Sequence, residues 1–220
     1  MTPRLAIVFA SALLVLAASA AAATDPGKEQ VHLVAADQAA ARAAVLLRTD
    51  LGAGWTGGQK KPSLSSTPDC PGWHPKQSDL VLTGAAEADF THAGLEVDSN
   101  AQVLRTARMV RLDWGRTAVA PQVMRCMRTE LQKQTPSGAK VVSVKRIAFP
   151  RVSTYTAAYR LTIDVTSGTT TVPVWSDMIL FGRGRTELEL TVIAPAAASA
   201  TLAAAEARLA HLMVARAKAS

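Results

Sequence analysis

Two glutamates, Glu187 and Glu189, stand two residues apart in a segment where apolar and polar residues alternate. In an extended strand this spacing places both carboxyl groups on the same face. Paired carboxyl groups that line a cleft can act as general acid and base. The alternation itself favours a strand face exposed to solvent, and nothing in the sequence supplies a second wall for a cleft.

Cysteine, histidine and serine offer few further catalytic candidates. His74 follows Cys70 by four residues, but a zinc site needs three or four converging ligands. Ser137 and Lys140 match the Ser-x-x-Lys pattern of penicillin-binding proteins, yet they belong to a Pro-Ser-Gly turn and no Lys-Thr-Gly triplet follows. The P-loop, nucleophile-elbow, HExxH and EF-hand motifs are absent from the sequence. We therefore expect no catalytic residue, no cofactor and no metal, and keep an unrecognised hydrolase only as an alternative.

The first residues have the layout of a secretory signal peptide. Residues 1–23 carry one positive charge at Arg4, an apolar run that begins at Leu5, and then small residues that suit cleavage. No cysteine follows the apolar run, so a lipid anchor is not expected. The sequence predicts a cleaved signal peptide and a secreted or extracytoplasmic protein, with a retained N-terminal membrane anchor as the alternative.

The cysteine content agrees with export. Cys70 and Cys126 are the only two cysteines in the chain. In an exported protein an even pair is most simply joined, so we predict a disulfide between them.

Length and composition limit the class of protein. The chain has 220 residues and a formal net charge of +7, and 42 of its residues are alanine. These values exclude a small disulfide-rich scaffold, a multi-domain enzyme and a collagen-like chain. After the signal peptide we expect a polar lead-in over 24–34 and a single α+β domain over 35–220.

Hydrophobic periodicity predicts the elements that must position the polar residues. Helices are expected at three places: 35–51, from Thr117 to about residue 135, and after Pro195. Strands are expected at six places: 79–90, 101–112, 141–149, 154–166, 171–181 and 187–194. Residues 52–78 are expected to form a long loop. Short turns between the last four strands indicate an antiparallel meander. The predicted order is α-β-β-α-β-β-β-β-α, an α+β fold with helices packed on an antiparallel sheet of about six strands.

The charges are divided unevenly along the chain. Residues 24–100 hold 6 basic and 10 acidic side chains, whereas residues 101–220 hold 17 basic and 7 acidic ones. Seven of the basic residues fall close together: Arg105, Arg108, Arg111, Arg116, Arg125, Arg128 and Lys133. Such a cluster can attract anionic envelope polymers or lipid headgroups. The alternative is a solvated helix face with arginines that pair with the acidic first half. Aromatic residues do not alternate with the basic ones, so no nucleic-acid partner is expected.

Three short segments carry a resemblance to known proteins. They are Asp50 to Trp55 (DLGAGW), Asp69 to Gly72 (DCPG) and Ser78 to Gly84 (SDLVLTG). They resemble segments of exported actinobacterial proteins and, more distantly, of the extracellular sensor-type domains of receptor kinases and related envelope lipoproteins. The resemblance covers about residues 35 to 195. It implies a cleft between sheet and helices and a ligand-binding role, and it transfers no functional residue to this chain.

The sequence therefore predicts an exported, non-enzymatic binding or sensor-like module of the cell envelope, with its pocket between the sheet and the Cys70 loop. Its partner would be an envelope lipid, glycan or protein, and contact with a membrane surface is compatible with its charge. An interaction protein that docks on an anionic surface through the basic cluster is the second hypothesis. The candidate binding residues are Trp55, Trp73, Arg105, Arg108, Arg111, Arg125 and Arg128.

Overall fold

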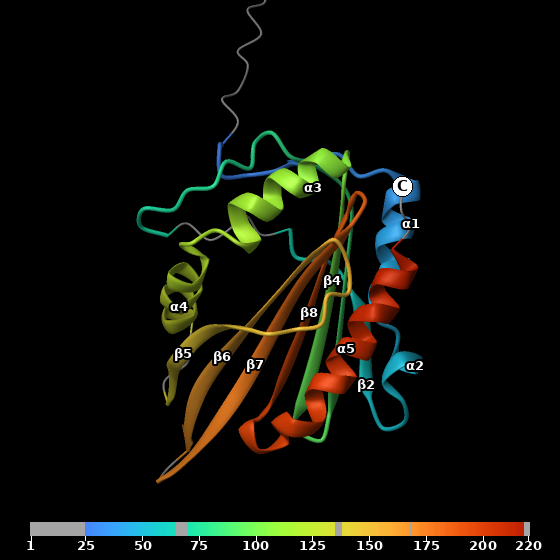
Figure 1. Ribbon diagram of the computed structural model, residues 1–220. Helices are drawn as coiled ribbons and strands as arrows, with labels where there is room; N and C mark the ends of the chain where they lie inside the picture. The colour runs from blue at the N-terminus through green and yellow to red at the C-terminus, as the bar shows by residue number, and fades with distance from the viewer. Residues whose placement is uncertain (1–24, 65–69, 135–137, 168, 218–220) are drawn as a thin grey trace, which may run out of the picture.

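The computed structural model describes residues 25–64, 70–134, 138–167 and 169–217 (Figure 1). The predicted signal peptide over 1–23 and Ser137 of the Ser-x-x-Lys pattern lie outside the described residues. The chain folds as an α+β protein around an open, mixed sheet of eight strands. The strands are β1 (Gln30–Val31), β2 (Thr56–Lys60), β3 (Val81–His92), β4 (Leu95–Leu104), β5 (Ala139–Ile147), β6 (Tyr155–Ser167), β7 (Thr170–Arg183) and β8 (Thr186–Pro195).

The sheet has the strand order β1-β3-β4-β8-β7-β6-β5, and β2 pairs with the outer side of β3. Strands β5 to β8 form the predicted antiparallel meander. The prediction of a purely antiparallel sheet of about six strands is wrong, because β1 pairs with β3 in parallel. Strand β2 lies inside the predicted long loop, where its pairing with β3 supplies the hydrogen bonds that its own glycine-rich sequence does not indicate.

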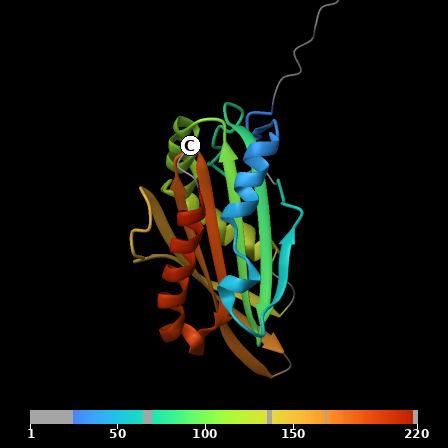
Figure 2. The same ribbon diagram turned by 90° about the vertical axis from the view of Figure 1, so that its right-hand side faces the viewer.

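Helices lie on both sides of the sheet. They are α1 (Ala35–Ala44), α2 (Arg48–Leu51), α3 (Ala107–Asp113), the π-helical turn η1 (Trp114–Ala118), α4 (Val123–Gln134), the 3-10 turn η2 (Ala196–Ala198) and α5 (Ser199–Arg216). Helices α1 and α5 lie side by side on one face (Figure 2). Helix α3 crosses one end of the sheet, and α4 packs on β5 (Figure 1). None of the helices in the described ranges is long and apolar enough to span a membrane.

The main core lies between the sheet and the pair α1 and α5. It combines Phe90 of β3, Ile179 of β7 and Leu190 of β8 with Met213 of α5, all of which are almost fully buried. The first predicted helix is broken after Ala44, because Val45 and Leu46 turn into this core. The freed amide of Leu46 donates to the hydroxyl of Ser99, 3.1 Å away in the middle of β4.

Two other segments also differ from the prediction. Residues 98–100 were expected to separate two strands, but they lie within β4, and the hairpin turn falls at Ala93 and Gly94 instead. Both turn residues have positive φ angles, as a tight hairpin requires. Residues 107–113 form α3 rather than a strand, and Thr106 caps this helix by accepting a hydrogen bond from the amide of Met109.

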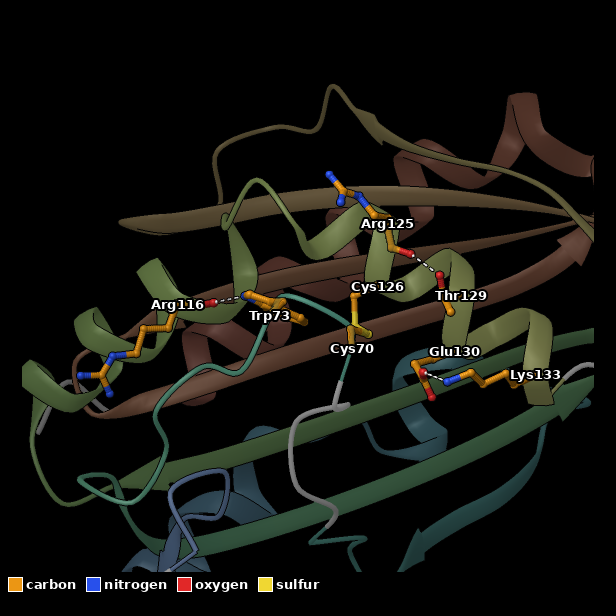
Figure 3. Close-up of a disulfide and its surroundings, with 8 residues drawn as sticks. All are labelled: Cys70, Trp73, Arg116, Arg125, Cys126, Thr129, Glu130 and Lys133. Atoms are coloured by element: carbon orange, nitrogen blue, oxygen red, sulfur yellow. Dashed lines mark hydrogen bonds and ion pairs between the residues drawn. A yellow bond between two sulfur atoms is a disulfide. The ribbon is translucent and has the colours of Figure 1, made fainter.

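Cys70 and Cys126 form the predicted disulfide, with their Cα atoms 5.5 Å apart (Figure 3). Both residues are buried. The bond fastens α4 to the segment that precedes β3. The same segment is held by Trp73, whose indole Nε1 donates to the carbonyl of Arg116 at 3.2 Å.

Three arginines of the basic second half pair with aspartates of the acidic first half. Arg116 binds Asp79, Arg185 binds Asp37, and Arg216 binds Asp50, each with two hydrogen bonds. The Arg185 pair connects the β7–β8 turn to α1, and the Arg216 pair connects the end of α5 to α2. Of the residues in the predicted basic cluster, only Arg116 takes part in this pairing.

Candidate functional site

The face of the sheet opposite α1 and α5 carries the polar residues of β4 and β8. Along β8, Leu188, Leu190 and Val192 point into the main core, so Glu187 and Glu189 point to the other face. The pairing register sets Gln102 of β4 beside Glu187 and Asn100 beside Glu189. Two carboxyl groups and two amides are therefore adjacent on one surface.

This surface is the floor of a cleft of about 180 Å³. The second wall, which the sequence did not indicate, comes from the end of α3 and from η1. The floor is lined by Asn100, Gln102, Leu180, Phe181, Glu187, Leu188 and Glu189, and the wall by Asp113, Trp114, Thr117 and Ala118. The expectation of a fully solvated Glu187–Glu189 face is therefore wrong, because both side chains are partly buried beneath this wall.

The π-helical turn η1 is what brings Trp114 and Asp113 over the sheet. Its last hydrogen bond runs from the amide of Val119 to the carbonyl of Trp114, five residues back. A π-helical turn of this kind is rare and occurs often at functional sites. The ring of Trp114 packs against Tyr155 with the ring centres 5.4 Å apart. The hydroxyl of Tyr159 donates to the carbonyl of Ala118 at 2.5 Å, which fixes the other end of the turn to β6.

The segment after the disulfide supports this wall from outside. Arg116 donates to both carboxylate oxygens of Asp79, at 2.6 and 3.0 Å, and to the carbonyl of Lys76 at 2.7 Å. Gln77 donates through Nε2 to Oδ1 of Asp113 at 3.0 Å. The pocket was expected between the sheet and the Cys70 loop. The cleft is instead walled by α3 and η1, and the Cys70 segment packs behind that wall.

The carboxyl groups of the cleft are protonated more readily than ordinary ones. Burial raises the pKa of Glu187 well above its usual range, and the neighbouring Asp113 raises it further. Burial also raises the pKa of Asp113, while hydrogen bonds with Gln77 and Glu187 oppose that increase. The hydrogen bond between the two raises the pKa of Glu187 and lowers that of Asp113, so Glu187 is the more readily protonated of the pair. Burial raises the pKa of Glu189, and it raises the pKa of Glu29, which lies near Asp113, to about 7.

Further carboxyl groups lie next to the cleft on the same sheet face. Asp98 of β4 stands opposite Asp89 of β3. Lys60 of β2 binds Glu87 at 2.9 Å and Asp89 at 2.8 Å. Burial raises the pKa of Asp98, and Lys60 counteracts this increase. The surroundings of the cleft are therefore strongly acidic, and in the described residues that line the cleft there is no Lys, Arg or His.

The structure does not bring the predicted binding residues together. Trp55 lies beside His92 at the β3–β4 hairpin, with ring centres 5.5 Å apart. Trp73 lies against η1 near the opposite end of β3. None of the seven candidate binding residues lines the cleft. The five candidate arginines are exposed and fall into two groups, with Arg105, Arg108 and Arg111 at α3 and Arg125 and Arg128 on α4.

Sequence reasoning missed Asn100, Gln102, Asp113 and Trp114. A signal for the first two exists, because Asn100 and Gln102 alternate with the apolar residues Ala101 and Val103 as in a half-buried strand. Asp113 and Trp114 carry no such local signal. Within the described ranges, no group of three or more His, Cys, Asp or Glu side chains is arranged to hold a metal ion.

The structure thus defines an α+β protein with a small acidic cleft on one face of its sheet. No protein-family model, curated protein or solved structure matches the chain.

Proposed function

We propose that this protein is an exported, non-enzymatic binding module of the cell envelope, and that its ligand enters the cleft between η1 and the sheet. The observation that carries the proposal is the construction of the cleft. Trp114 is fixed as an aromatic wall over a floor of paired carboxyl and amide groups. Pockets with an apolar wall and a few convergent polar groups are the usual form of small-ligand sites.

The charge of the lining favours a ligand with an ammonium group. Asp113, Glu187 and Glu189 are all carboxyl groups, and binding of a cation would relieve the cost of burying their negative charge. The indole of Trp114 offers the aromatic face that organic cations favour. At about 180 Å³ the cleft is smaller than the usual drug-sized pocket of about 300–1,000 Å³. It would therefore receive a headgroup or a small amine rather than a large molecule.

Hydrolysis is less well supported by the same geometry. Glu187 and Asp113 share a hydrogen bond, whereas the two carboxyl groups of glycosidases are usually separated by at least about 5 Å. A histidine that converges with Ser, Asp or Glu is the usual general base of a hydrolase, and among the described lining residues the carboxyl groups converge without one.

Calorimetric titration with a matched pair of small molecules tests the proposal. Putrescine, a diammonium cation at neutral pH, is compared with 1,4-butanediol, which has the same carbon chain without charge, and with glucose as a neutral polyol. We expect putrescine to bind and butanediol not to bind. Glu187→Gln and Trp114→Ala should each weaken putrescine binding at least tenfold. Glu96→Gln removes a carboxylate that is exposed outside the cleft, so it should have little effect.

Each other result of this titration has a definite meaning. Binding of glucose but not putrescine would contradict the cationic ligand and keep the binding site. Equal weakening by Glu187→Gln and Glu96→Gln would assign putrescine to diffuse surface charge rather than to the cleft. Binding of none of the three would contradict the proposed site.

Export is part of the proposal and has a separate test. Its support is the sequence of residues 1–23 and the Cys70–Cys126 disulfide, a bond that is typical of oxidising compartments. Mass spectrometry of the protein from fractionated cells should find it outside the cytoplasm, with an N-terminus close to residue 24. Recovery from the cytoplasm with residue 1 intact would contradict export.

A further inference from the structure

An edge strand of the sheet and the helix that packs beside it carry a group of basic side chains. Among the described residues, strand β5 pairs with β6 alone, and no described strand lies on its other edge. Helix α4 lies against β5. Arg128 donates to the carbonyl of Val142 at 2.9 Å, and the side-chain oxygen of Gln132 accepts from the amide of Val141 at 3.2 Å. We call this region the α4–β5 surface; its basic residues are Arg125, Arg128, Lys140, Lys145 and Arg146, together with Lys133, which is paired with Glu130 and is not counted among these five.

The cations of the α4–β5 surface are exposed; one of them, Lys140, has Asp164 of β6 as its register partner. All five are exposed, and within the described part of the chain none of them forms an ion pair. Arg116, Arg160, Arg185 and Arg216, by contrast, each bind an aspartate. In Figure 3 the guanidinium of Arg125 points away from the buried disulfide. The Cys70–Cys126 bond holds α4, and with it this group, in place.

Strand geometry spreads the positive charge around the edge of the sheet. Lys145 is paired with Arg160, and Arg146 with Tyr159, so their side chains leave β5 on opposite faces. Lysines on an edge strand also discourage pairing with another sheet. That role does not account for Arg125, which lies on α4 rather than on the edge strand.

Two apolar side chains are exposed in the same region. Met124 of α4 is 39% exposed and Val142 of β5 is 41% exposed. Basic residues around exposed apolar ones are the combination that binds the interface of anionic bilayers, where the apolar groups enter the acyl boundary and the cations meet phosphate groups. A soluble polyanion would use the cations and leave the apolar pair in water.

We propose that the α4–β5 surface docks on a bilayer that contains anionic phospholipids. This inference goes beyond the binding cleft and does not depend on it, since none of the seven residues involved lines the cleft. It also revises the basic cluster expected from the sequence. Arg125 and Arg128 remain, Lys140, Lys145 and Arg146 join them, and Arg105, Arg108 and Arg111 belong to a separate surface at α3.

Vesicle flotation with the protein purified from cells that express the full chain tests the proposal. Vesicles of phosphatidylcholine alone are compared with vesicles that contain one quarter phosphatidylglycerol. We expect at least tenfold stronger binding to the anionic vesicles in 50 mM salt and loss of most of that preference in 500 mM salt. Arg125→Glu with Arg146→Glu should abolish the preference. These two side chains make no hydrogen bond among the contacts described, so folding should be kept.

Arg105→Glu with Arg108→Glu is the matched control, because it makes the same change in net charge on exposed residues elsewhere. It should retain most of the binding. Equal loss in both double variants would overturn the proposal in favour of diffuse attraction, and equal binding to both kinds of vesicle would overturn it directly.

Met124→Ser with Val142→Thr leaves the charge unchanged and tests the apolar contribution. We expect these substitutions to weaken vesicle binding at least threefold and to leave binding of soluble dextran sulfate unchanged. If dextran sulfate competes fully with vesicles and this variant binds vesicles normally, the surface recognises a soluble polyanion, and the membrane proposal is wrong. Circular dichroism spectra and intact disulfide mass confirm the fold of each variant.

Discussion

Glu187 of β8 and Asp113 of α3 are joined by a hydrogen bond that connects the floor of the cleft to its wall. Both groups have a raised pKa, and for both the larger cause is burial. A pair of this kind is a place where protonation and ligand binding compete. A cation that enters the cleft favours the ionised carboxylates and therefore expels the proton.

Binding of an ammonium ligand should therefore release protons. Since the cation lowers the pKa of Glu187 from its raised value, putrescine affinity should increase as the pH rises through that value. Titrations in buffers with different ionisation enthalpies measure the number of protons released. Glu187→Gln should reduce the release, whereas Glu96→Gln should not. Binding without proton release would contradict an ammonium group at this pair.

A second buried acid should make stability depend on pH. Glu206 of α5 is 2% exposed and lies against Asp177 of β7, which Arg160 of β6 binds. Burial and the neighbouring Asp177 raise the pKa of Glu206 to about 7. Between its ordinary value and about 7 the folded protein holds a proton that the unfolded chain loses, so stability falls as the pH rises. Arg160 faces the same pair and limits the effect.

Glu206→Gln should remove the part of this dependence that Glu206 contributes, while Glu29 and Glu187, whose pKa values are also raised, keep theirs. The contribution of Glu206 to the free energy of unfolding should fall by up to about 3 kcal/mol from pH 4.5 to pH 7.5. The free energy of unfolding of the variant should depend less on pH, and at pH 7.5 the variant should be more stable than the unmodified protein. Urea unfolding at a series of pH values measures the free energy of unfolding of each protein. A pH dependence that is the same in the two proteins would contradict the assignment to Glu206.

Loss of the disulfide should destabilise the protein strongly. Cys70 and Cys126 are 56 residues apart, and closing a loop of that length stabilises a fold by about 4 kcal/mol in the chain-entropy model. Cys70→Ser with Cys126→Ser should lower the free energy of unfolding by about that amount. Unfolding of the oxidised protein with and without reductant gives an independent measurement. A decrease of less than about 1 kcal/mol in the free energy of unfolding would show that the disulfide hardly constrains the unfolded chain.

Gly84 of β3 should tolerate no side chain. A Cβ at this position would lie 2.3 Å from the carbonyl oxygen of Asp37 in α1, so the helix and the strand must move apart. We expect Gly84→Ala to cost at least about 1–3 kcal/mol of stability. Gly115→Ala is the matched control, because a Cβ there meets no atom within 4 Å. Thermal unfolding should show a clearly lower melting temperature for Gly84→Ala and an unchanged one for Gly115→Ala.

The second half of the fold could be predicted because its strands are long and amphipathic. Strands β6 to β8 alternate regularly, and short turns leave only an antiparallel meander. The first half has weaker local signals. The steps of three between Arg105, Arg108 and Arg111 indicate a helix, but the apolar residues among them suggested a strand. Strands β1 and β2 are short and become strands only through pairing with β3.

The floor of the candidate site could be predicted from strand periodicity, whereas its wall could not. The common face of Glu187 and Glu189 follows from strand periodicity. The wall does not, because it depends on a π-helical turn whose position is fixed by distant contacts with Tyr155 and Tyr159. A local pattern does not encode such contacts, so Trp114 could not be distinguished from a core residue by its sequence.

The pairing of Arg216 with Asp50 connects residues that are 166 positions apart, and α5 supplies Leu209, Ala210 and Met213 to the main core. Contacts over so long a separation slow folding, because much chain entropy must be lost before they form. The core also stays incomplete until α5 has been synthesised. A polypeptide with this topology remains extended for longer after it leaves the ribosome, and that delay would suit the export proposed above, in which the chain crosses a translocation channel before it folds.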